Sequence, residues 1–440
     1  MPAAGACRDD RHGEGRRRLF AWLLDSPLIA GPLPTAIAVA GAIGGIVLFA
    51  RRNRRWWTRT VPISVGIGVL GALLAAGALA LVPLFPDALP PRVLIWIGVG
   101  VAAVAAAVGR IAGRRRVVIT LTAAVLVLSM CAIKVNAFYG YRTTLAGVLG
   151  LPAANEIAFD SVVRSEAIVP IAGWQPPPDM PHSGRIARAD VPGVASGFAA
   201  RPAWVYLPPA YLASSRPLLP VIVLVPGQPG GPDDWLRAGR LAAVLDHYAA
   251  DHAGIAPVVV VPDATGASLA NPLCLDSRLG RAETYLTVDV PAWIGSRLQV
   301  GTDRAVGGFS FGGTCALQLA VRRPDVYPTF LDVSGQAEPT LGDHTRTVAA
   351  TFGGDETAFR AVTPLPLLAT HRFPGSAGIL TVGADDPVYR PQAEQVVAAA
   401  RAAGMDVTLS VRPGGHTWAL AGDGLAEFLP LVARRTGLSP

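Results

Sequence analysis

The chain has 440 residues, of which 51% are hydrophobic and only 16% are charged. With a mean hydropathy of +0.41, this composition excludes an ordinary soluble protein and predicts membrane-spanning segments. The net charge of +7 does not indicate a nucleic-acid-binding protein, because the basic excess is confined to the first 150 residues, where it flanks apolar runs.

A basic tail, residues 1–26, opens the chain, and residues 27–135 contain four apolar stretches separated by short polar loops. Each stretch is about long enough to cross a hydrocarbon core of roughly 30 Å as a helix. We therefore expect a multi-pass protein of the cell membrane. The stretches are residues 27–50, 61–84, 92–109 and 117–135.

Arginine-rich loops indicate how these spans are oriented. The loops at 51–60 and 110–116 carry five and four arginines, whereas the loop at 86–92 carries one arginine and one aspartate. The positive-inside rule puts the two arginine-rich loops in the cytoplasm, so both termini are expected outside. The basic tail alone would favour the opposite orientation, but two internal loops outweigh it. The domain after the last span is therefore predicted to be extracytoplasmic.

Residues 136–185 are predicted to be an interfacial segment followed by a proline-rich linker, because aromatic residues precede the sequence WQPPPDMPHSG. Over residues 186–440, strand-like apolar runs alternate with helical ones, which predicts a mostly parallel sheet covered by helices on both faces. The stretch 336–376 has few strong patterns and is where we expect any lid. The predicted strands are 203–208, 220–226, 257–263, 304–308, 329–334, 378–383 and 407–413, and the predicted helices are 235–250, 283–298, 311–322, 391–403 and 424–436.

A serine between glycines lies where the fourth predicted strand meets a predicted helix. In Gly308-Phe309-Ser310-Phe311-Gly312, the glycines leave room for a sharp turn that exposes the serine hydroxyl. The helix that follows directs its positive end towards developing negative charge. The same pattern occurs by chance in simple glycine-rich turns, but the flanking strand and helix favour a catalytic nucleophile at Ser310.

A nucleophilic serine needs a base and an orienting carboxylate, and the chain order Ser–Asp–His is typical of α/β-hydrolases. His416 follows the last predicted strand in a glycine-containing loop and is the candidate base; the alternative is a loop histidine that caps the final helix. Asp386 follows the preceding strand and is the preferred acid, with Asp385 as the alternative. An aspartate before proline also favours a simple turn.

The sequence VLVPGQPGGPDDW follows the second predicted strand. Its glycines allow backbone N–H groups to approach a substrate oxygen, so the amides of Gln228 and Phe311 are expected to form an oxyanion hole. The same glycines would equally make a flexible loop. The cysteines show no CxxC motif and no Cys/His spacing that would suggest zinc. A serine mechanism of this kind implies neither a metal nor an organic cofactor.

Residues 186–437 resemble the esterase branch of the α/β-hydrolases, which includes S-formylglutathione hydrolase, enterobactin and feruloyl esterases, and the antigen 85 mycolyltransferases. The resemblance implies an α/β-hydrolase fold with Ser310, Asp386 and His416 as nucleophile, acid and base, and with an oxyanion amide from Gln228. Four spans before such a domain resemble membrane-anchored esterases of actinobacteria. The matching pieces are LVPGQPG, GRAETYLTVDVPAWI, GGFSFGG, DVSGQ and GGHTW.

The chain departs from the family pattern at two places. Pro226-Gly227 stands where many hydrolases have His-Gly, and an aspartate stands where the mycolyltransferases use a glutamate as the acid. The second difference weakens the interpretation as a transferase. Cys274 and Cys315 are predicted to form a disulfide, which would fit an oxidising exterior; two buried thiols are the alternative.

The sequence thus predicts a membrane-anchored serine esterase that hydrolyses carboxylic esters, with a lipid or envelope glycolipid as substrate, through an acyl-enzyme. An acyltransferase would use the same triad and replace water by a sugar or lipid hydroxyl. A catalytically inactive scaffold of the cell envelope is the third hypothesis. The oligomeric state is left open by the sequence.

Overall fold

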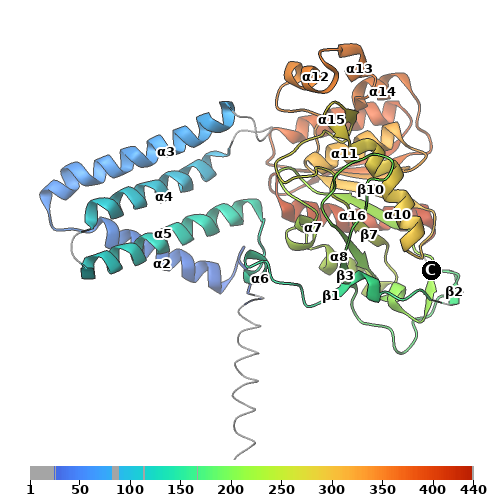
Figure 1. Cartoon of the computed structure of the whole chain (residues 1–440), viewed down its shortest axis with the longest axis horizontal. Helices are drawn as coiled ribbons and strands as arrows, with labels where there is room; N and C mark the ends of the chain where they lie inside the picture. The colour runs from blue at the N-terminus through green and yellow to red at the C-terminus, as the bar shows by residue number, and fades with distance from the viewer. Residues whose placement is uncertain (1–23, 25, 82–88, 112–113, 166, 439–440) are drawn as a thin grey trace, which may run out of the picture. The chain divides into compact units, whose positions relative to one another are not determined.

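The computed structural model describes residues 24, 26–81, 89–111, 114–165 and 167–438. The chain divides into two compact units, and the sequence passes from one to the other between Ala153 and Ala154 (Figure 1).

The first unit contains four helices that are long and apolar enough to cross a membrane, which confirms the predicted apolar helices. Large apolar side chains such as Ile46 and Leu73 are 66% and 64% exposed, as expected for surfaces that meet lipid rather than a protein core. The helices are α2 (Pro32–Phe49), α3 (Val61–Leu81), α4 (Pro91–Arg110) and α5 (Arg114–Tyr139), with a π-helical turn η1 (Trp56–Thr60) before α3 and a short α6 (Leu145–Val148) after α5.

Small residues let these helices approach one another closely. Helix α2 packs along α5, and α3 packs along α4 (Figure 1). A Cβ atom added at Gly68 of α3 would lie 2.5 Å from the carbonyl oxygen of Gly98 in α4, so only glycine permits this backbone contact.

The second unit is built on a nine-stranded sheet with the order β1-β3-β4-β7-β6-β10-β11-β12-β13. Within it, β4 is antiparallel to both neighbours and the other neighbouring strands are parallel, as predicted for a mostly parallel sheet. The strands are β1 (Glu156–Ala158), β3 (Arg185–Ala189), β4 (Ala203–Leu207), β6 (Val221–Val225), β7 (Val258–Val261), β10 (Arg304–Phe309), β11 (Thr329–Val333), β12 (Ala377–Gly383) and β13 (Asp406–Arg412).

Four short strands form two small ribbons beside this sheet. They are β2 (Ala167–Val169) with β5 (Ser215–Pro217), and β8 (Asp276–Ser277) with β9 (Gly280–Arg281). Two of the strands that the sequence did not predict, β1 and β2, lie within residues 136–185, the segment expected to be interfacial and linking. The main sheet therefore takes its first strand from that segment.

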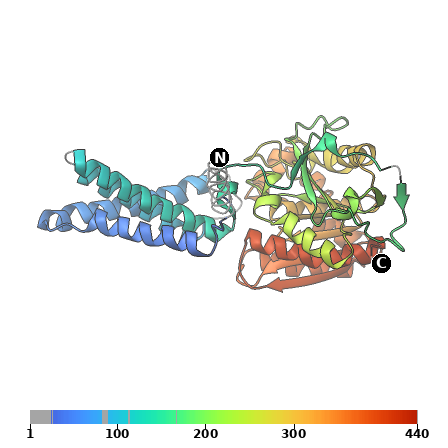
Figure 2. The same cartoon turned by 90° about the horizontal axis from the view of Figure 1, so that it is seen from below.

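Helices cover both faces of the main sheet (Figure 2). Helices α8 and α16 pack together on one face, while α14 packs against α11 and α15. Asp332 and Val333 are adjacent in β11, so their side chains lie on opposite faces of the sheet. Asp332 lies against Gly313 of α11 and Val333 lies against Gly424 of α16, which puts these two helices on opposite faces. The helices are α7 (Asp233–Arg237), α8 (Leu241–Asp251), α9 (Ala282–Thr284), α10 (Val290–Arg297), α11 (Phe311–Arg322), α12 (His344–Phe352), α13 (Glu356–Arg360), α14 (Pro364–Thr370), α15 (Tyr389–Ala402) and α16 (Trp418–Thr436), with short turns η2 (Phe159–Ser161), η3 (Pro209–Leu212) and η4 (Tyr285–Asp289).

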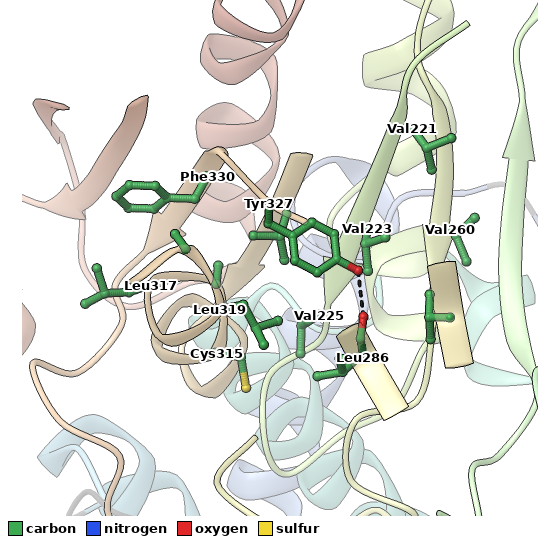
Figure 3. Close-up of a cluster of buried hydrophobic side chains, with 14 of the residues drawn as sticks. Val221, Val223, Val225, Val260, Leu286, Cys315, Leu317, Leu319, Tyr327 and Phe330 are labelled. Atoms are coloured by element: carbon green, nitrogen blue, oxygen red, sulfur yellow. Dashed lines mark hydrogen bonds between the residues drawn. The ribbon is translucent and has the colours of Figure 1, made fainter. Parts of the chain in front are cut away.

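The core on the α11 side is formed by alternate residues of β6 and the inner face of α11 (Figure 3). Val221, Val223 and Val225 are fully buried there, and the Tyr327 hydroxyl donates to the Leu286 carbonyl oxygen at 2.7 Å. The rigid packing of α11 against the sheet fixes the turn between β10 and α11.

Candidate active site

Ser310 lies in the turn between β10 and α11 with φ 58° and ψ −119°. A positive φ is rare for a residue with a side chain and stores backbone strain. The turn needs its two glycines, because a Cβ at Gly308 would lie 2.1 Å from Gly312 atoms, and one at Gly312 would lie 2.1 Å from the Val225 carbonyl oxygen. The Ser310 N–H donates to the Val333 carbonyl oxygen at 2.8 Å, which ties the turn to the neighbouring strand.

His416 and Asp386 face each other from two loops at the carboxyl ends of β13 and β12. The His416 Nδ1 and Asp386 Oδ2 atoms are 3.5 Å apart, and the side chains are 28% and 3% exposed. Both atoms are buried, neither makes a hydrogen bond to a described residue, and they face each other at the outer limit of hydrogen-bond length.

Hydrogen bonds also set the charge of Asp386. Its Oδ1 accepts from the N–H groups of Val388 and Tyr389 at 3.2 and 3.0 Å. Burial alone would raise the pKa of this carboxyl, but the facing His416 ring and the two amides outweigh burial and lower the pKa below its ordinary value. Asp386 is therefore ionised at neutral pH.

The His416 ring contacts two aromatic rings. Its centroid is 4.7 Å from that of Phe309 and 4.3 Å from that of Tyr389. Because Phe309 directly precedes Ser310, this packing brings the imidazole next to the strained turn. The cap of α16 comes from Thr417, whose hydroxyl accepts from the Leu420 N–H, so His416 does not cap the final helix.

The neighbouring aspartate has different surroundings. The Asp385 side chain is exposed, and its backbone N–H donates to the Gly414 carbonyl oxygen at 2.9 Å. Of the two adjacent acids, Asp386 is the one that the structure brings to His416.

The glycine-rich segment after β6 lies beside the turn. A Cβ at Gly227 would be 3.8 Å from the Ser310 Cβ, so the backbone at 227–228 borders the serine. The Gln228 side chain donates from Nε2 to the Leu269 carbonyl oxygen at 3.1 Å and so points to a neighbouring loop. Phe311 is the first residue of α11, and an N–H group at this position has no acceptor within its own helix.

A disulfide joins Cys274 to Cys315, with Cα atoms 5.5 Å apart, which confirms the predicted pairing. It fastens the loop before β8 to the second turn of α11. Among the described residues, no group of three or more His, Cys, Asp or Glu side chains is arranged to hold a metal ion.

Sequence reasoning missed two buried carboxylates of the second unit. Asp332 pairs with Gly308 across β10 and β11, and burial raises the pKa of its carboxyl to about 7, although the Gly335 N–H donates to it at 2.7 Å. Asp263 is fully buried after β7 and is paired with Arg201. The sequence could have revealed both residues, because Asp332 lies within an apolar strand and Asp263 closely follows one.

The family model described as "Putative esterase" matches residues 199–420. An uncharacterized protein of Corynebacterium glutamicum is 33% identical over 436 residues, which cover 95% of this chain and 99% of that protein. That match therefore includes the apolar helices as well as the sheet.

Two solved structures are similar to the second unit. A ferulic acid esterase is 21% identical with a TM-score of 0.50, covering 58% of this chain and 98% of its own. An S-formylglutathione hydrolase from Agrobacterium tumefaciens is 18% identical with a TM-score of 0.49, covering 58% of this chain and 97% of its own. With its mostly parallel sheet, and with the family model matching half of its length, the chain belongs to the esterase family of the α/β-hydrolases.

Proposed function

We propose that this chain is a membrane-anchored serine esterase with Ser310 as nucleophile, His416 as general base and Asp386 as the orienting acid. The observation that carries the proposal is the strained turn at Ser310, next to an imidazole held by a buried, ionised carboxylate. Membership of the esterase family supports a hydrolase.

The proposed reaction passes through an acyl-enzyme. His416 Nε2 takes the Ser310 proton as Oγ attacks the ester carbonyl carbon, and the oxyanion that forms accepts hydrogen bonds from the Gln228 and Phe311 amides. The carbon–oxygen bond to the alcohol then breaks, and His416 gives its proton to the leaving alkoxide. His416 then takes a proton from water as its oxygen attacks the acyl carbon. The bond to Ser310 Oγ breaks, and His416 returns the proton to Oγ as the carboxylic acid leaves.

The negative Asp386 carboxylate stabilises the imidazolium that exists between these two proton transfers. It also fixes the tautomer, because Nδ1 must carry its proton towards Asp386 for Nε2 to act as a base. Burial of Asp386 strengthens this interaction, since few water molecules can screen it.

We further propose that the catalytic unit lies outside the cytoplasm and acts on carboxylic esters of membrane or envelope lipids. Two observations support this location: arginine-rich loops flank the apolar helices, and a disulfide is typical of an oxidising compartment. Tethering to the membrane gives such an enzyme a high local concentration of lipid esters.

Fluorophosphonate labelling of membranes tests the nucleophile. Wild-type protein is expected to be labelled, whereas Ser310→Ala is not. Ser334→Ala is the matched control, because Ser334 also follows a strand with positive φ but is only 1% exposed, and its variant should keep full labelling.

Unlabelled wild-type protein is then offered ester substrates extracted from the membrane. Release of a free carboxylic acid supports hydrolysis. Transfer of the acyl group to an added sugar or lipid alcohol would instead identify the protein as an acyltransferase. A folded wild-type protein that resists labelling would contradict the proposal and favour an inactive scaffold.

A further inference from the structure

Arg201, just before β4, uses its whole guanidinium group in hydrogen bonds. Its Nε and Nη2 donate to the two oxygens of Asp263 at 2.9 and 2.8 Å. Nη2 also donates to the Thr265 hydroxyl and to the Gly230 carbonyl oxygen, both at 2.9 Å, and Nη1 donates to the Ser268 hydroxyl at 3.0 Å. One side chain therefore joins two loops, residues 227–231 and residues 265–269.

The partner carboxylate is a fixed anchor. Asp263 is fully buried and also accepts from the N–H groups of Arg201, Thr265 and Gly266 at 2.8, 3.1 and 3.1 Å. Burial would raise the pKa of this carboxyl, but its hydrogen bonds with Arg201 outweigh burial and lower the pKa. A buried ion pair of this kind is costly to disrupt, because either partner alone would be an uncompensated charge.

The 227–231 loop is further fastened to the 265–269 loop by its own atoms. The Gly230 N–H donates to the Ser268 carbonyl oxygen at 3.0 Å, and Gln228 Nε2 donates to the Leu269 carbonyl oxygen at 3.1 Å. The three glycines of the loop add backbone freedom, while the Gly231 N–H donates to the Asp234 carboxylate at 2.8 Å. The shape of the loop therefore depends in part on the neighbouring loop, which Arg201 holds.

We propose that Arg201 is a positioning residue that holds the 227–231 loop with the Gln228 N–H directed at the oxyanion; this rests on the function proposed above. An oxyanion donor is effective only when it is fixed before the charge develops. Lysine cannot replace Arg201, because a single ammonium cannot donate in the plane to Asp263, Gly230 and Ser268 together.

The test compares Arg201→Lys with Arg323→Lys in the full-length protein, using p-nitrophenyl acetate and a fluorophosphonate. Arg323 is the matched control, since it donates to both oxygens of Asp325 at 3.0 and 2.9 Å at the far end of α11. For Arg201→Lys, kcat and the labelling rate should fall roughly 10- to 100-fold, less than the loss on deleting an oxyanion donor. The KM and the pH midpoint should stay unchanged, and Arg323→Lys should match the wild type.

Hydrogen exchange gives a readout that does not need activity. Amides of residues 227–231 should exchange faster in Arg201→Lys and at the wild-type rate in Arg323→Lys. Ser268→Ala removes one partner of Arg201 and keeps the ion pair, so it should lower kcat by roughly 2- to 10-fold in a protein that folds normally.

Unchanged kcat and unchanged exchange in Arg201→Lys would overturn the inference, as would a loss confined to KM or to thermal stability. A wild-type protein that is not labelled by the fluorophosphonate would instead contradict the proposed function. The exchange rates of the 227–231 amides would still decide whether Arg201 holds the loop.

Discussion

Two adjacent aspartates at the end of β12 occupy opposite environments. Asp386 is buried against His416 and accepts two backbone N–H groups, whereas the Asp385 side chain is exposed. Activity should therefore be sensitive to a substitution of Asp386 and should tolerate the same substitution of Asp385.

Asp386→Asn is expected to lower kcat by about 10³- to 10⁴-fold, because the amide cannot stabilise the imidazolium and favours the wrong tautomer. Asp385→Asn, its matched control, should stay within about twofold of the wild type, as surface changes away from a site are usually small. Steady-state hydrolysis of p-nitrophenyl acetate measures both. Equal losses in the two variants, or a loss only at Asp385, would contradict the assignment of Asp386.

The buried Asp332 carboxyl makes a separate prediction about stability. Its folded-state pKa is about 7, compared with an unfolded value near 3.9, so the folded state binds more protons than the unfolded state between these pH values. The contribution of Asp332 to stability is therefore expected to fall as the pH rises from about 4 to 7. Above pH 7 the folded protein contains an ionised carboxylate with little compensation.

Asp332→Asn should remove this part of the pH dependence while keeping an oxygen that can accept from the Gly335 N–H. At pH 8 the Tm of the variant should exceed that of the wild type by several degrees, since 1 kcal/mol corresponds to about 2–4 °C in a domain of this size. Thermal unfolding in detergent from pH 5 to 8 measures the difference. Asp325→Asn is the control, because the pKa of exposed Asp325 is lowered by Arg323. Parallel curves for wild type and Asp332→Asn would refute the prediction.

At the scale of single elements, burial decides which strands the sequence reveals. Strand β6 reads VIVLV and is fully buried on both faces, so its apolar run is unmistakable. Strand β1, at the sheet edge, has two half-buried residues and one exposed residue, and β3 carries Arg185 and Arg188. Neither has an apolar run, and both form because a neighbouring strand supplies their hydrogen-bond partners.

Helix continuity was also hard to predict. The predicted helix 235–250 is broken between α7 and α8, where Arg240 has a left-handed φ of 53°. The predicted helix 283–298 starts one residue earlier and includes the π-helical turn η4 before α10. Apolar periodicity reports the buried face of such segments, but it does not detect a local change in hydrogen-bond pattern.

The candidate site also contains residues that the sequence suggested and residues that it missed. Ser310, Asp386 and His416 each follow a predicted strand, so their order along the chain suggested them as candidates, with Asp385 as the alternative to Asp386. Arg201 and Asp263 are 62 positions apart, without a shared motif. They meet because β4 pairs with β7 in a register that aligns Trp204 with Val261, and that pairing was not predictable from either segment alone.

The whole molecule combines apolar helices with a disulfide-containing catalytic unit, and these features make one joint prediction about orientation. The disulfide favours an oxidising compartment for the second unit. The arginines at 51–60 and 110–116 favour the cytoplasm for the loops between helices. Both conditions are met only if the chain crosses the membrane an odd number of times between the first arginine-rich loop and the second unit, as it would if α3, α4 and α5 each span it.

Cysteines introduced on the two sides test this arrangement with a membrane-impermeant maleimide, in a background that lacks Cys7 and Cys131. Val194→Cys lies at a site that is 84% exposed in the catalytic unit and should be labelled in intact cells. Asn53→Cys lies between Arg52 and Arg54, leaves every arginine in place and should be labelled only after lysis. The reverse pattern would put the catalytic unit in the cytoplasm, where a stable disulfide would be unexpected. Labelling of both sites in intact cells would show that the arginine loops do not orient the helices.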